Sequence, residues 1–74
     1  MKTYKTVLEK PEHATCVLYF GENQEEALKA FSYGQKVIRS AMPYTTAKGW
    51  SIKTVLMETV KVEKETVLNY SSVD

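Results

Sequence analysis

The sequence predicts an α+β domain in which one helix packs on one face of an antiparallel sheet of about four strands. One long stretch, 23–42, carries apolar residues at helical spacing, and stretches rich in strand-forming residues lie on both sides of it. The expected order is therefore β-β-α-β-β. The 74 residues form a single domain over 1–74, and the polar residues 71–74 are expected to fray.

The two strands expected before the helix are residues 3–10 and 14–20. The second, ATCVLYF, is dense in residues that favour strands and is followed by Gly21. Pro11 closes the first strand, because proline cannot donate a hydrogen bond to a neighbouring strand. Cys16, the single cysteine, lies within this apolar run and is expected to be buried.

The helix has a clear start and a clear end. Asn23 followed by Glu26 is typical of an N-cap with an acidic residue in the first turn, and Pro43 ends the helix. Four of the seven residues in its apolar stripe are Ala or Gly, which predicts a close approach to the sheet. The stripe consists of Ala27, Ala30, Phe31, Gly34, Val37, Ile38 and Ala41.

After the helix, residues 43–50 are expected to be a loop at the edge of a binding surface. Residues 50–62 and 65–70 are the two remaining strand candidates, with a charged turn at 63–65. Trp50 begins the first of these strands, and its ring is expected to pack at the end of the core.

Composition restricts the class of protein. Ten basic and nine acidic side chains leave a net charge of +1, so no global field favours nucleic acid or a membrane surface. The first ten residues hold no apolar segment of signal-peptide length. We therefore expect a cytoplasmic protein with no membrane partner.

The sequence holds no catalytic pattern, and we expect the protein not to be an enzyme. His13 and Cys16 stand three residues apart, so a strand would place them on opposite faces. The three glycines are too scattered for a phosphate-binding loop. One cysteine and one histidine are too few for a zinc site, and neither a metal nor another cofactor is expected.

The two faces of the predicted sheet give the main functional expectation. Both carry large apolar residues, whereas a single helix covers only one. The uncovered face predicts a small non-catalytic interaction module, such as an accessory regulator or inhibitor, that binds a protein partner or itself; we expect a homodimer. The predicted contact residues are Val17, Tyr19, Val55 and Met57 on the face, with Tyr44 and Lys48 in the loop.

A small nucleic-acid-binding protein is the alternative. Lys36 and Arg39 lie near the C-terminal end of the helix, and Tyr44 and Lys48 follow in the loop. Cations beside an aromatic ring suit single-stranded nucleic acid, because they hold the backbone while the ring stacks on a base. The same cations also complement the negative end of a helix dipole, which gives them a structural reason.

Overall fold

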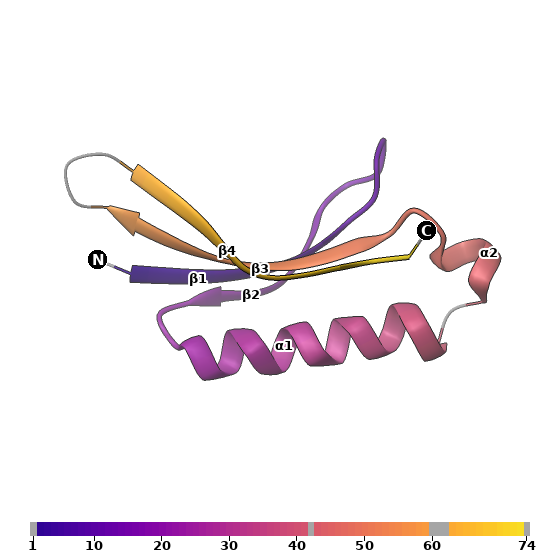
Figure 1. The fold of residues 1–74 in the computed structure, drawn as a ribbon, viewed down its shortest axis with the longest axis horizontal. Coiled ribbons are helices and arrows are strands. Elements are labelled where there is room, and N and C mark those ends of the chain that lie inside the picture. Colours follow the sequence, from indigo (N-terminus) through magenta and orange to yellow (C-terminus); the bar gives the residue numbers. More distant parts are fainter. Residues whose placement is uncertain (1, 42, 60–62, 74) are drawn as a thin grey trace.

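The computed structural model describes residues 2–41, 43–59 and 63–73 (Figure 1). The side chains of residues 41, 44, 59 and 63 lie outside this description. The predicted α+β class is confirmed. The elements in chain order are β1 (Lys2–Glu9), β2 (Cys16–Gly21), α1 (Gln24–Lys36), the π-helical segment η1 (Val37–Ala41), α2 (Tyr44–Ala47), β3 (Ser51–Thr59) and β4 (Glu63–Ser72).

The four strands form one antiparallel sheet in the order β2-β1-β3-β4. Helix α1 runs along one face of this sheet and packs on β1, β2 and β3 (Figure 1). Within the described part of the chain, no other element covers the opposite face. The β1–β2 hairpin and the far ends of β3 and β4 bend away from α1, so this uncovered face is concave along its length (Figure 1).

The start of α1 follows the predicted capping pattern. The Oδ1 of Asn23 accepts a hydrogen bond from the backbone N–H of Glu26 at 3.1 Å. The helix then widens into η1, which ends at Ala41, ahead of Pro43. The predicted range of 23–42 is thus confirmed up to residue 41, and residue 42 lies outside the described part.

Gly34 allows the close helix–sheet contact that the stripe of small residues predicts. A methyl group added at Gly34 would overlap Ile52 Cδ1 and would lie 2.7 Å from Leu18 Cδ1. The core cluster around this contact consists of Leu8, Phe31, Ile38 and Ile52, with Leu18, Trp50 and Val73 packed against it. Trp50 therefore packs at the end of the core, as expected.

A bulge in β2 changes the face on which its side chains lie. Thr6 pairs with Tyr19 and Val7 pairs with Val17, so Leu18 is an extra residue in β2. Strict alternation predicted Tyr19 on the uncovered face, and that prediction is wrong. Tyr19 shares the helix side with its partner Thr6, whose hydroxyl donates to Ala27 O of α1 at 2.8 Å.

The segment 43–50 is more ordered than the predicted loop. It contains the one-turn helix α2, and Ala47 at its end is only 1 % exposed. The backbone N–H of Gly49 donates to Val73 O at 2.8 Å, and that of Val73 donates to Trp50 O at 2.9 Å. These bonds tie the segment to the chain beyond β4.

Two predictions about the C-terminal part of the chain are wrong. The charged stretch 63–65 is not a turn, because β4 begins at Glu63. Residues 71–73 are not frayed: Ser71 is 9 % exposed, and its Oγ accepts hydrogen bonds from Gln35 Nε2 at 3.4 Å and Arg39 Nη2 at 3.3 Å. Asp74 lies outside the described residues.

Candidate protein-binding face

We call the side of the sheet that faces away from α1 the open face. All four strands contribute side chains to it, and its middle is a hollow of about 230 Å³. Val7 and Val55 form the floor of the hollow, with Val17 and Met57 beside them. Three of the predicted contact residues, Val17, Val55 and Met57, therefore lie together on this face.

The largest exposed apolar side chains gather on the open face. Five such side chains are more than half exposed in the described part of the chain, and four of them project from β2 or β4 on this side. On β2 these are Val17, which is 54 % exposed, and Phe20, which is 64 % exposed. On β4 they are Val67, which is 54 % exposed, and Tyr70, which is 63 % exposed. The fifth, Tyr33, lies on α1 and is 66 % exposed.

The two floor valines are already covered by their neighbours. Val7 is 3 % exposed and Val55 is 2 % exposed, although no helix or strand in the described part lies over them. The half-buried lysines Lys5 and Lys53 are their direct partners across β1 and β3, and their side chains line the same hollow. The prediction that Val55 is exposed is therefore wrong, although its position on this face is right.

The charged side chains that line the hollow balance. They are Lys5, Lys53, Glu9 and Glu65, two of each sign. Lys53 Nζ lies 3.2 Å from Glu9 Oε1, and these side chains are 31 % and 35 % exposed. Solvent screens a pair with this much exposure, so it orients the two side chains more than it stabilises the fold.

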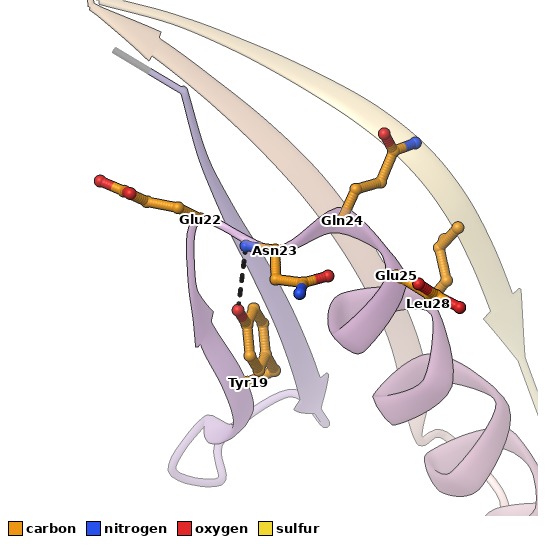
Figure 2. Close-up of a pocket in the computed structure, with 6 residues that line it drawn as sticks. All are labelled: Tyr19, Glu22, Asn23, Gln24, Glu25 and Leu28. Atoms are coloured by element: carbon orange, nitrogen blue, oxygen red, sulfur yellow. Dashed lines mark hydrogen bonds between the residues drawn. The ribbon is translucent and has the colours of Figure 1, made fainter.

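Tyr19 lies at the junction of β2 and α1 instead. Its phenolic oxygen accepts a hydrogen bond from the backbone N–H of Asn23 at 3.1 Å (Figure 2). It also lines a wide, open depression at the start of α1, together with Glu22, Asn23, Gln24, Glu25 and Leu28 (Figure 2). Sequence reasoning assigned this tyrosine to the open face and missed its neighbour Phe20, which takes that place.

The residues of the nucleic-acid alternative do not form one described cluster. Lys36 and Arg39 are exposed near the C-terminal end of the long helix, and Lys48 is exposed in the turn after α2. The guanidinium of Arg39 is engaged with Ser71. The side chain of Tyr44 lies outside the described residues, so its predicted contact role stays a prediction.

The β1–β2 hairpin brings His13 to Trp50 and leaves Cys16 exposed. The His13 ring centroid lies 5.8 Å from that of Trp50, and His13 Nδ1 is 3.1 Å from Pro11 O. The expectation that Cys16 is buried is wrong, because it opens the edge strand β2 and no element of the described part packs outside that strand.

The described residues show neither a metal-binding cluster nor a membrane-spanning helix. No group of three or more His, Cys, Asp or Glu side chains among them could hold a metal ion. None of the helices in ranges 2–41 and 43–59 has the length and apolar character needed to cross a membrane.

The chain was compared with known protein families, with curated proteins and with solved structures. It matches none of them.

Proposed function

We propose that this chain is a non-catalytic interaction module that binds protein through the open face. The observation that carries the proposal is the gathering of four of the five most exposed large apolar side chains on this face. Soluble monomers rarely leave large apolar patches bare, and such patches mark interaction sites.

The chemistry of the face also suits a protein partner. Exposed aliphatic and aromatic side chains lie along β2 and β4, while the lysines and glutamates around the hollow supply polar contacts. Mixed apolar and polar character, with aromatic anchors, is typical of protein interfaces. The two lysines and two glutamates that line the hollow offset one another, so they give a polyanion such as nucleic acid no preference for it.

Tyr70 and Tyr33 offer a matched pair for the test. Both are tyrosines, with exposed fractions of 63 % and 66 %, but Tyr70 lies on the open face and Tyr33 on α1. We would replace each in turn with the photo-cross-linking residue benzoylphenylalanine and irradiate the two variants in a native extract. Protein adducts should form from position 70 and be much rarer from position 33.

A competition measurement makes the test specific. An excess of the unlabelled Tyr33→Lys variant should suppress the adducts, whereas Tyr70→Lys should not. Equal adduct yields at the two positions would contradict the proposal. Adducts with nucleic acid from position 33, which lies beside Lys36 on α1, would favour the alternative function.

A further inference from the structure

We infer that the partner on the open face is a second copy of this chain, packed face to face about a two-fold axis. The inference rests on the proposed function, since it names the occupant of the same surface. Two-fold dimers are the most common symmetric assemblies, and their interface brings the same patch of both copies together.

Charge is the first argument. In a two-fold interface every charged group is present twice, so a face with a net charge repels its own copy. The described ionisable side chains that line the hollow of the open face are two lysines and two glutamates, so this repulsion is absent there. Lys53 pairs with Glu9 within the chain, whereas Lys5 and Glu65 form no ion pair within the described part. Lys5 of one copy is therefore available to pair with Glu65 of the other copy.

The strand order is the second argument. The exposed apolar residues form two groups, Val17 and Phe20 on the edge strand β2, and Val67 and Tyr70 on the opposite edge strand β4. Consider a two-fold axis that lies between the two copies, parallel to the strands and centred above the β1–β3 pair. Rotation about this axis places β2 of one copy over β4 of the other. One rotation therefore covers both apolar edges of both copies, because the sheet order β2-β1-β3-β4 is simply reversed.

The size of the sheet sets an upper limit on this contact. The Cα atoms span 43 × 25 × 16 Å, and Figure 1, which looks along the shortest axis, shows the sheet nearly edge-on. The 43 Å length also includes α2, so the open face is shorter than this; it is about 16 Å wide at the Cα level. A face-to-face contact over this sheet therefore lies at or below the roughly 800 Å² per partner of a standard interface.

The first experiment measures mass against concentration by sedimentation equilibrium. The unmodified protein should be a dimer, Tyr70→Lys a monomer with an unchanged circular dichroism spectrum, and Tyr33→Lys a dimer. A dimer that persists in Tyr70→Lys and in Val67→Lys would overturn the inference, because it would use another surface.

The second experiment uses the charges. Lys5→Glu gives the lining of the hollow a charge of −2, and Glu65→Lys gives it a charge of +2. Each variant alone should self-associate at least about tenfold more weakly, and an equimolar mixture should recover dimers containing one copy of each. No preference for mixed dimers would count against a shared, self-complementary face.

The outcomes separate this inference from the proposed function. If the purified protein stays monomeric up to ~1 mM while position 70 captures a different protein, the inference fails and the function stands. If position 70 captures nothing above position 33, both fail. Adducts between two copies from position 70, together with mixed dimers, support both.

Discussion

The hydroxyl groups of Thr6 and Thr54 lie 2.9 Å apart on the helix side of the sheet, and both residues are fully buried. Thr6 Oγ1 also donates to the backbone carbonyl of Ala27 at 2.8 Å. Because a hydroxyl has one proton, Thr54 must be the donor to Thr6. The two threonines thus connect β1, β3 and α1 through two hydrogen bonds that leave neither oxygen without a partner.

The first prediction concerns this pair. Thr6→Val should lower the free energy of unfolding by roughly 1–3 kcal/mol, because it leaves the Thr54 donor buried without an acceptor. Thr54→Val should cost less, since Thr6 keeps its bond to Ala27. The double variant should lose less stability than the sum of the two single losses, because no buried hydroxyl then remains. Urea denaturation of the three variants gives their free energies of unfolding.

Thr66→Val, at an exposed position, is the control and should leave the free energy of unfolding nearly unchanged. If the losses of the two single variants simply add in the double variant, the two hydroxyls do not interact.

The second prediction concerns Gly34. Gly34→Leu should destabilise the fold by roughly 1–3 kcal/mol, because its side chain would meet Ile52 and Leu18 where the helix approaches the sheet. Thermal unfolding measures the change. Ser32→Leu, on the exposed side of α1, should leave the melting temperature nearly unchanged. Equal melting temperatures for the two variants would exclude the close contact.

Most of the fold prediction rested on the spacing of apolar residues and on the helix-capping residues. The helix boundaries could be predicted because Asn23, Glu26 and Pro43 act locally, through groups within one turn. The packing of Gly34 could be predicted as well, since a glycine in a helix interior is costly unless its lack of a side chain is used.

The errors arise where distant parts of the chain decide the outcome. The bulge at Leu18 depends on the register between β1 and β2, and no residue type near it signals an extra position. The order of residues 71–73 depends on bonds to Trp50, Gly49 and the helix, which sequence proximity does not show. The composition of the open face was therefore predicted correctly at Val17, Val55 and Met57 and wrongly at Tyr19.

The third prediction uses the bulge. Tyr19 and Phe20 are neighbours on opposite faces, so their lysine variants should behave differently. In a Tyr70→Lys background, where association does not contribute to stability, Tyr19→Lys should lower the free energy of unfolding, because it removes the acceptor for Asn23 N–H and a half-buried ring. Phe20→Lys in the same background should leave it nearly unchanged, since its ring is 64 % exposed.

In the otherwise unmodified chain, Phe20→Lys should weaken association instead. Denaturant unfolding gives the first result and sedimentation the second. The reverse pattern, a stable Tyr19 variant and an unfolded Phe20 variant, would return Tyr19 to the open face.

The last prediction concerns Gly49, which has a φ of +91° and connects α2 to β3. An alanine there must adopt a left-handed conformation, so Gly49→Ala should cost roughly 1–2 kcal/mol. The strain acts on the turn in which Gly49 N–H donates to Val73 O and Trp50 O accepts from Val73 N–H, so it should also speed the amide exchange of Val73. Lys48→Ala, next to it and exposed, should change neither quantity. If Gly49→Ala lowers stability but leaves Val73 exchange unchanged, the turn does not hold the C-terminal segment in place.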